Sequence, residues 1–401
     1  MINKQKLLIV SRSTVFHNKS GGMETQLDNL IHYLKNYYDI TVVTTALPFK
    51  RKPRKINQIR VNHGISYVFL KDTVPGEYGY NLYESLFWQI PIKRNFDSLN
   101  KKFTKKAAEY YKDKLQGKFS IILSQSSSAQ NFTLSNKEKL ILVNHGTTIN
   151  EIRNRFNSAK GIKDFVRFIF LDFPSLIYEY FVNNPKLFNE STKIVLISSR
   201  VKKDFNHQHK GYKNKVVVIP NGINTKKFKP LKKNKKFSVV YAGRIDYEKG
   251  LDRFLEVAKE LPEIKFEIYG DGPDVLNIKY QISNIKNLKY FGAVSNEKIA
   301  KIFGRSHVFL FLTKRREGMP MSILEALSSG CAVISTLKDR ASLSKSGYVL
   351  VSSVSESISV LKKLRGNPST FIKYSKLARN YAKNNYSYEL MGKKYLDLLR
   401  S

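Results

Sequence analysis

The sequence predicts an α/β protein with two Rossmann-like domains, each built on a parallel sheet. Short apolar runs alternate with helical patterns along the chain, which is the signature of strands wrapped by helices. The alternation occurs twice, before and after a lysine-rich connector at 226–236. A length of 401 residues also suits two domains. We therefore expect two halves that face each other across a cleft.

The first half opens with a strand, a loop, a helix and a second strand. Leu7–Val10 is a continuous apolar run, typical of a parallel strand that is covered on both faces. A polar loop ends in Gly21-Gly22, and 23–36 then carries apolar residues at helical spacing. Further strands are expected at 40–44, 65–70, 121–123, 140–143, 194–197 and 216–219, and a basic helix at 101–114.

Two features of this half have alternative interpretations. Gly21-Gly22 before a helix could cradle a phosphate or let a substrate approach the backbone, but it could equally be a tight turn. His145 follows the 140–143 strand, at the sheet edge where ligands bind in open α/β folds. A histidine there could also be structural.

Three segments of the first half stand out by composition. The proline-containing basic stretch 50–55 is expected to be a loop, and 78–96 is rich in aromatic residues. The stretch 161–181 has large apolar side chains interrupted by single charges. It could be an interfacial helix that lies on a membrane, or a buried helix broken near Pro174.

The second half repeats the alternation more regularly. Strands are expected at 237–242, 266–269, 288–291, 307–312, 332–335 and 348–351, and helices at 251–261, 296–303, from about 322, and at 355–364, 369–384 and 388–400. We place the domains at 1–217, with the returning helix 386–401, and at 218–385.

Unusual residues gather at the carboxyl ends of the second-half strands. They are Gly243, Arg244 and Lys249 after the first strand, Gly270 and Gly272 after the next, and Glu317, Gly318 and Glu325 after the fourth. Two cations beside a helix N-terminus can clamp a diphosphate, and two carboxylates can hold vicinal hydroxyls. A sugar nucleotide carries both a diphosphate and vicinal hydroxyls, so these residues together predict a sugar-nucleotide site.

Local alternatives exist for the same residues. Arg244 could pair with Asp246, and Lys249 could lie on a solvated face. Ser322 and Glu325 have the spacing of a capping box, in which the glutamate bonds back to the start of its helix.

The composition of the chain limits the classes of partner that it is expected to bind. With 70 Lys plus Arg against 32 Asp plus Glu, the net charge is +38, which favours nucleic acid, an anionic membrane or anionic substrates. The single cysteine, Cys331, excludes an intrachain disulfide and reads as a small buried residue. The N-terminus reads as a strand, and no apolar run is long enough to span a bilayer. We expect a cytoplasmic protein, or one peripheral on the cytosolic face of a membrane.

These motifs together resemble the retaining glycosyltransferases of family 4, which have the GT-B fold. I-P-N-G-I-N (219–224) resembles the family's hinge-proximal motif, and G-R-I-D-Y-E-K-G (243–250) its phosphate-binding segment. Y-G-D-G-P (269–273) resembles its glycine turn near the nucleoside, and E-G-M-P-M-S-I-L-E-A (317–326) its Glu-x7-Glu motif. Gly21-Gly22, the N-H-G-T segment around His145, and the final segment from Tyr386 also match.

The resemblance implies a role for each matching residue. Arg244 and Lys249 would bind the diphosphate, Glu317 the donor sugar, Glu325 the ribose, and His145 would lie near the transferring sugar. Gly21, Gly22, Gly243, Gly270, Gly272, Gly318, Met319 and Pro320 would line the donor site. The last helix would cross back onto the first domain. One segment departs from the family, because L-K-D-R-A-S-L (337–343) is a shorter and different loop from the one in which family members carry a Gly-Gly and an acidic residue.

We therefore expect transfer of a sugar from a nucleoside diphosphate sugar to a glycan or lipid-linked acceptor, with an anionic membrane surface as a further partner. No Asp-x-Asp motif occurs, so we expect no required metal or cofactor. An epimerase or phosphorylase on the same fold is the nearest alternative. A basic nucleic-acid-binding protein is the alternative from another class, but no recognised nucleic-acid module is present.

Overall fold

The computed structural model describes residues 4–17, 21–47, 57–73, 96–159, 161–337 and 346–401. The chain divides into two compact units, Met1–Pro220 with Gly392–Ser401, and Asn221–Met391. The predicted loop at 50–55, the aromatic-rich stretch 78–95 and most of the atypical loop 337–343 lie outside the described residues.

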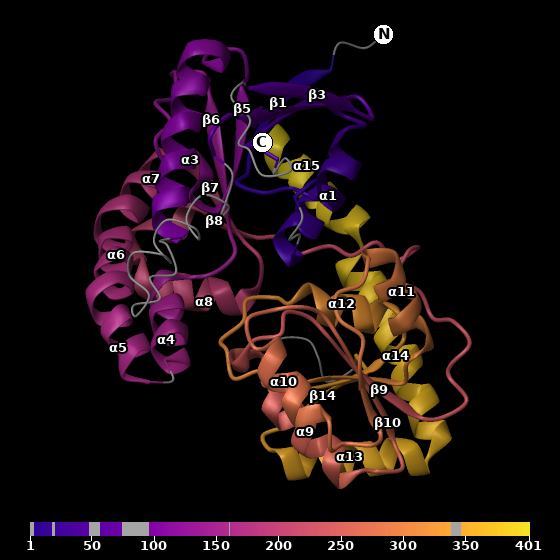
Figure 1. Cartoon of the computed structure of the whole chain (residues 1–401). Helices are drawn as coiled ribbons and strands as arrows, with labels where there is room; N and C mark the ends of the chain where they lie inside the picture. The colour runs from indigo at the N-terminus through magenta and orange to yellow at the C-terminus, as the bar shows by residue number, and fades with distance from the viewer. Residues whose placement is uncertain (1–3, 18–20, 48–56, 74–95, 160, 338–345) are drawn as a thin grey trace. The chain divides into compact units, whose positions relative to one another are not determined.

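The first unit is built on a sheet that, in the described residues, has the strand order β3-β4-β2-β1-β5-β6-β7-β8 (Figure 1). All neighbours pair in parallel except β3, which is antiparallel to β4 at the sheet edge. The strands are β1 (Gln5–Val10), β2 (Tyr38–Thr45), β3 (Gln58–Asn62), β4 (Ile65–Leu70), β5 (Ile121–Gln125), β6 (Lys139–Asn144), β7 (Ser191–Leu196) and β8 (Val216–Val218). The central strands are apolar on both faces, as helices on both sides require.

Helices connect these strands. They are α1 (Gly22–Leu34), α3 (Phe96–Tyr110, continued by the π turn η1, Tyr111–Leu115), α4 (Thr148–Ser158) and α8 (Ser199–Gln208). Short 3₁₀ turns occur at η2 (Ser126–Ala129) and η5 (Lys210–Lys215). Helix α8 begins where Ser198 accepts a hydrogen bond from the Val201 N–H, an ordinary side-chain cap.

The stretch 162–190 is a continuous succession of helical turns. It runs through α5 (Ile162–Arg167), the π turn η3 (Phe168–Asp172), α6 (Phe173–Tyr178), the π turn η4 (Glu179–Asn183) and α7 (Asn184–Glu190). Pro174 is the second residue of α6, which directly follows η3, so helical turns continue through it and the change from π to α hydrogen bonding occurs beside a residue that has no N–H to donate. Many apolar side chains here are exposed. The interpretation as a buried, broken helix is therefore wrong.

The second unit holds a wholly parallel sheet with the order β11-β10-β9-β12-β13-β14 in the described residues. Its strands are β9 (Ser238–Ala242), β10 (Lys265–Tyr269), β11 (Leu288–Tyr290), β12 (Val308–Phe311), β13 (Ala332–Ser335) and β14 (Tyr348–Leu350). Its helices are α9 (Leu251–Glu260), α10 (Val275–Ile282), α11 (Asn296–Arg305), α12 (Met321–Ser328), α13 (Val354–Gly366) and α14 (Pro368–Tyr386), with a 3₁₀ turn η6 (Tyr247–Lys249).

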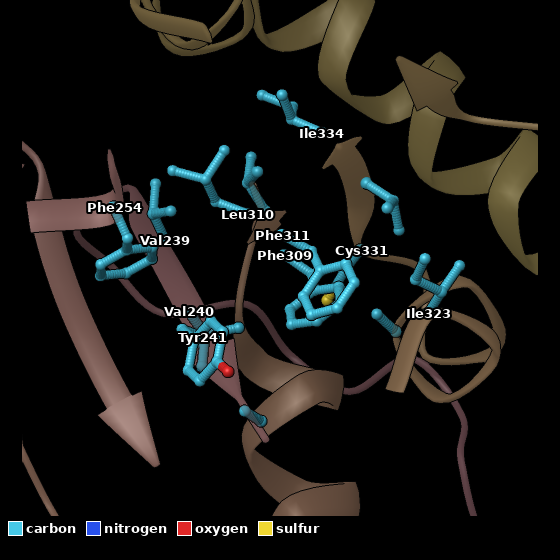
Figure 2. Packing of buried hydrophobic residues seen from close by; sticks show 14 of the residues in the cluster. Val239, Val240, Tyr241, Phe254, Phe309, Leu310, Phe311, Ile323, Cys331 and Ile334 are labelled. Carbon is cyan, nitrogen blue, oxygen red and sulfur yellow. The ribbon is translucent and has the colours of Figure 1, made fainter. Parts of the chain in front are cut away.

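The core of the second unit lies between this sheet and its helices. Figure 2 shows the side chains of β9 and β12 packed with those of α9, α12 and β13. Cys331 is fully buried in this cluster, as expected for a small apolar residue. Burial of this kind holds the two central strands, and the loops that follow them, at fixed positions.

The last helix, α15 (Tyr388–Arg400), belongs to both units. Its first turn follows a bridge between Ser387 and Ile223 of the second unit. From Gly392 onward it packs with the first unit, where Gly392 leaves room for the Tyr33 ring and Arg400 lies 5.5 Å from the Tyr37 ring centroid. The expected return of the terminal helix to the first domain is thus present.

Candidate functional site

The second-unit site lies where the strand order reverses. Strands β9, β10 and β11 proceed along the sheet in one direction, whereas β12, β13 and β14 proceed in the other. The loops that follow the neighbouring strands β9 and β12 therefore leave the sheet in opposite directions. Ligands of open α/β sheets bind in the crevice that this divergence creates. Residues 243–250 and 312–320 are these two loops.

Backbone contacts join the two loops. The Lys314 N–H donates to the Glu248 carbonyl oxygen at 2.9 Å, and the Thr313 hydroxyl donates to the same oxygen at 3.2 Å. Gly250 has φ 72°, and a Cβ there would lie 1.9 Å from the Leu312 carbonyl oxygen. Only glycine accepts both the left-handed conformation and this close approach.

Lys249 and Glu317 come together across the loops. The Lys249 Nζ forms an ion pair with Glu317 Oε1, and both side chains are largely buried. The Tyr241 hydroxyl donates to the Arg244 carbonyl oxygen at 2.8 Å and so supports the turn that carries Lys249. Burial, followed by the charge of Glu317, raises the pKa of Tyr241, which keeps this hydroxyl protonated.

Arg244 does not join this pair. Its side chain is 66% exposed, and its Nε lies 3.5 Å from Asp246 Oδ2. The local alternative, pairing with Asp246, is what the structure shows. An exposed arginine with a weakly held partner can still turn toward an incoming anion, since the surface pair costs little to break.

The predicted glycines pack the neighbouring loops together. A Cβ on Gly270 would lie 1.8 Å from the Gly243 carbonyl oxygen, and a Cβ on Gly272 would lie 2.1 Å from the Ile245 carbonyl oxygen. The loop after β10 thus rests directly on the loop after β9. The close packing of these two loops therefore requires glycine at both positions, whether or not a ligand binds there.

The N-terminus of α12 lies beside Glu317. Its N-cap residue is Pro320, and no side chain caps the helix. The alternative of a capping box formed by Ser322 and Glu325 is therefore wrong, because the helix begins at Met321 and Glu325 falls in its second turn. Gly318, Met319 and Pro320 form the preceding loop, and the Asn221 side-chain amide donates to the Met319 carbonyl oxygen at 3.3 Å. An uncapped N-terminus offers N–H groups and a positive dipole end to an anion.

Glu325 stands out among the carboxyl groups that the structure describes in this unit. It is 8% exposed, and its carboxylate has no hydrogen bond or ion pair with the residues that the structure describes. Burial raises its pKa to about 7, an effect that the charge of Lys227 partly offsets. A buried carboxyl without a partner is costly, so it points to a ligand that supplies hydrogen-bond donors.

In the first unit the strand order also reverses, between β1 and β5, with Gly21-Gly22 after β1 and His145 after β6, the strand next to β5. Gly21 is the N-cap of α1, and its N–H donates to Glu24 Oε2 at 2.7 Å, so Gly21-Gly22 begins the helix as predicted. His145 follows β6, and its Nε2 donates to Gln125 Oε1 at 2.7 Å. Burial lowers the pKa of His145 to about 4. At neutral pH the ring is uncharged and would contact a ligand only by hydrogen bonding.

Sequence reasoning overlooked several residues at these edges. Lys314 pairs with Asp252 at 2.5 Å and lies 3.7 Å from the Tyr247 ring centroid, and Arg315 pairs with Glu248 at 2.8 Å. In the first unit it overlooked Gln125, which orients His145. The three cations at 314–316 could have been recognised from the sequence, because they follow β12 closely. The contact of Gln125 with His145 could not, because it depends on β5 and β6 being neighbours in the sheet.

Among the described residues, no group of three or more His, Cys, Asp or Glu side chains is arranged to hold a metal ion. Within the same residues, no helix combines the length and the apolar character needed to cross a bilayer.

Residues 222–341 match the family described as glycosyl transferases group 1. The uncharacterized glycosyltransferase MJ1069 of Methanocaldococcus jannaschii is 22% identical over 98% of both chains. UDP-Gal:alpha-D-GlcNAc-diphosphoundecaprenol alpha-1,3-galactosyltransferase of Escherichia coli is 34% identical over 30% of this chain and 36% of its own length. Two further curated relatives are matched over only 29% and 27% of their length.

Solved structures show the same fold. Sucrose-phosphate synthase of Thermosynechococcus elongatus superposes with a TM-score of 0.76 at 14% identity, covering 99% of this chain and 98% of that one. Anabaena HepE in complex with UDP-glucose superposes with a TM-score of 0.66 at 13% identity, covering 98% and 99%. The predicted GT-B fold is confirmed, and the chain is similar to glycosyltransferases along its whole length.

Proposed function

We propose that the protein is a retaining glycosyltransferase of family 4. It transfers a sugar from a nucleoside diphosphate sugar to a glycan or lipid-linked acceptor at the cytosolic face of a membrane, in polysaccharide or glycoconjugate synthesis. The observation that carries the proposal is the grouping at the β9/β12 reversal. There, Lys249 and Glu317 meet beside the uncapped N-terminus of α12, and the buried carboxyl of Glu325, whose pKa burial raises, lies on the same helix.

Each group has a chemical task in this proposal. Lys249, Arg244 and the α12 N-terminus bind the diphosphate, whose negative charge grows as it departs. Glu325 accepts hydrogen bonds from the ribose hydroxyls, and Glu317 from hydroxyls of the sugar. Gly243, Gly270, Gly272, Gly318, Met319 and Pro320 line this donor site. The resemblance assigns the donor-side roles of Gly21, Gly22 and His145 in the first unit.

The transfer itself needs no enzymic nucleophile. The bond from the anomeric carbon to the diphosphate oxygen breaks, and the acceptor oxygen bonds to the same face of that carbon. The acceptor proton moves to the departing diphosphate. Lys249 and Arg244 stabilise the charge that develops there, so we propose that no metal is required.

The names of two similar proteins support the substrate classes. The E. coli relative is named for a UDP-galactose donor and a diphosphoundecaprenol-linked acceptor, and the HepE structure contains UDP-glucose. The exposed positive charge of this chain suits an anionic membrane better than a neutral one.

A thermal-shift screen against UDP-, GDP- and ADP-sugars tests donor binding. The matching donor should raise the unfolding temperature by several degrees, since ligand at a hundredfold excess over Kd stabilises by about 2.7 kcal/mol. The free sugars and EDTA serve as controls and should cause no shift. If none of the nucleotide sugars stabilises the protein, donor binding is disproved.

Glu317→Gln tests the stereochemical course. Glutamine keeps the shape of the side chain but removes its charge, so transfer should slow by about tenfold or more while the product keeps the donor's anomeric configuration. Proton NMR of the fresh product reports that configuration. An inverted product from either the wild type or the variant would contradict the retaining mechanism.

A further inference from the structure

The helical stretch 162–182 exposes an unusually apolar face. Its exposed large residues are Ile162, Phe165, Val166, Ile169, Phe170, Leu171, Phe173, Tyr178, Phe181 and Val182, which we call the 162–182 face. Ile162 is 84% exposed, Phe170 72% and Phe181 67%. Soluble proteins seldom leave so many large apolar side chains together in water. This face therefore has an occupant.

The backbone is shaped to keep these residues on one side. Apolar residues recur every fourth position in two parallel series, 162-166-170-174-178-182 and 165-169-173-177-181. In a pure α-helix each step of four would drift by about 40° around the axis. The π turns η3 and η4 contain wider hydrogen-bonded rings and counteract this drift. Such turns are rare and often mark functional segments.

Neighbouring elements extend and support the face. Phe156 of α4, itself exposed, meets Phe165 and Phe168 edge to face, with ring centroids 6.1 and 5.7 Å apart. Helices α4, α5 and α6 lie together in the first unit (Figure 1). The apolar surface is thus broad and belongs to several helices.

Charge identifies the occupant. Exposed cations border the face, with Arg153 on α4, Lys163 on α5 and Lys101 on α3, whose Nζ lies 5.8 Å from the Tyr178 ring centroid. The stretch holds three acids. Asp172 pairs with Arg155 at 2.8 Å and Arg167 at 3.8 Å, Glu179 accepts a hydrogen bond from the Asn183 side chain, and Asp164 is exposed next to Lys163 in the sequence. An apolar face with a cationic border complements the acyl region and anionic headgroups of a bilayer.

We propose that the 162–182 face is a membrane-docking surface, with Phe170 and Phe181 inserted among lipid acyl chains and Arg153, Lys163 and Lys101 on anionic headgroups. The docking proposal rests on the proposed function in one respect, because that function includes an acceptor at a membrane and the 162–182 face would provide the membrane association. It assigns that association to a surface of the first unit, remote in sequence from the donor-binding residues of the second unit.

The test is vesicle sedimentation with the full chain. Wild-type protein should bind phosphatidylglycerol-containing vesicles and bind pure phosphatidylcholine weakly. The double variant Phe170→Ser/Phe181→Ser should bind the anionic vesicles at least about tenfold more weakly at the same salt, because two exposed aromatic side chains no longer insert. Both residues are exposed, so thermal unfolding should stay unchanged.

The matched control is Ile59→Ser/Val61→Ser on β3. These side chains are 63% and 67% exposed, and β3 lies at the sheet edge opposite β8. This control should bind vesicles as the wild type does. Lys163→Gln/Lys101→Gln should lose binding mainly at low salt, where unscreened charge contributes most.

Two outcomes would overturn the proposal. One is vesicle binding that the Phe170/Phe181 variant retains in full. The other is a wild-type dimer in light scattering that this variant converts to a monomer, which would make the face an interface between copies. The thermal shift caused by a nucleotide sugar tests the proposed function independently of the membrane-docking proposal. Vesicle binding that depends on Phe170 and Phe181 in a protein that no nucleotide sugar stabilises would support docking and defeat only the proposed function.

Discussion

Replacing Lys249 with alanine is expected to lower kcat/KM about 10²- to 10³-fold. The ammonium is a largely buried cation at the β9/β12 reversal, and a preorganised group that stabilises a departing anion contributes on this scale. Arg244→Ala should also lose activity, although less, since the Arg244 side chain is exposed and must first leave Asp246. Steady-state kinetics with the donor found in the thermal screen measures both.

A matched control separates this effect from the loss of an ion pair. Arg365 pairs with Glu263 at 3.2 Å in the same unit, and it lies on α13 rather than in a loop that follows β9 or β12. Arg365→Ala should leave turnover within about twofold of the wild type, since exposed pairs contribute little. Near-normal turnover of both Lys249→Ala and Arg244→Ala would rule out their roles in the transfer.

Glu325→Gln is expected to stabilise the protein and impair donor binding. Burial raises the folded-state pKa of Glu325 to about 7, from 4.5. Between these values the folded chain holds a proton that the unfolded chain has lost, so stability falls as pH rises and levels off above about 7. Glutamine removes this cost. At about 1.4 kcal/mol per pKa unit, the free energy of unfolding at pH 8 should rise by about 3 kcal/mol.

Denaturant unfolding at pH 4 and pH 8 measures this effect, and the gain should vanish at pH 4, where the carboxyl is protonated in both states. Donor affinity should meanwhile fall about tenfold or more, because a charged acceptor is lost. Glu248→Gln is the control. That carboxylate already pairs with Arg315, so its removal should not stabilise. If Glu325→Gln left the free energy of unfolding at pH 8 unchanged, burial of the charged Glu325 carboxylate would not destabilise the folded chain, and the prediction would be wrong.

Much of the fold was predictable because the strands are buried on both faces. Leu7–Val10 and 307–312 read as strands from their continuous apolar runs, and the structure confirms them as β1 and β12. Strand β3 was not predicted, since its Ile59 and Val61 face solvent at an antiparallel edge and give no core-facing pattern. Helix α4 was missed for a related reason, because its sequence is mostly polar.

The candidate site was predictable as a collection of strand ends, but not as a geometry. Sequence placed Lys249 and Glu317 after strands, whereas their contact depends on β9 and β12 being neighbours 66 residues or more apart in the chain. The capping interpretation of Ser322 failed because Pro320 occupies the N-cap position instead. Burial of Glu325 is likewise a property of the folded helix, invisible in a four-residue pattern.

The two π turns set where the apolar stretch can change in length. A π turn holds one residue more than the α turn it replaces. Deleting Leu171 from η3 would let the turn close as an α turn that covers nearly the same angle, so Phe181 would stay on the side it shares with Phe170. The same deletion within α6 would instead rotate everything after it by about 100° around the helix axis. Among related chains, single-residue gaps at η3 or η4 would thus preserve the apolar face, whereas gaps elsewhere in the stretch would turn part of it away.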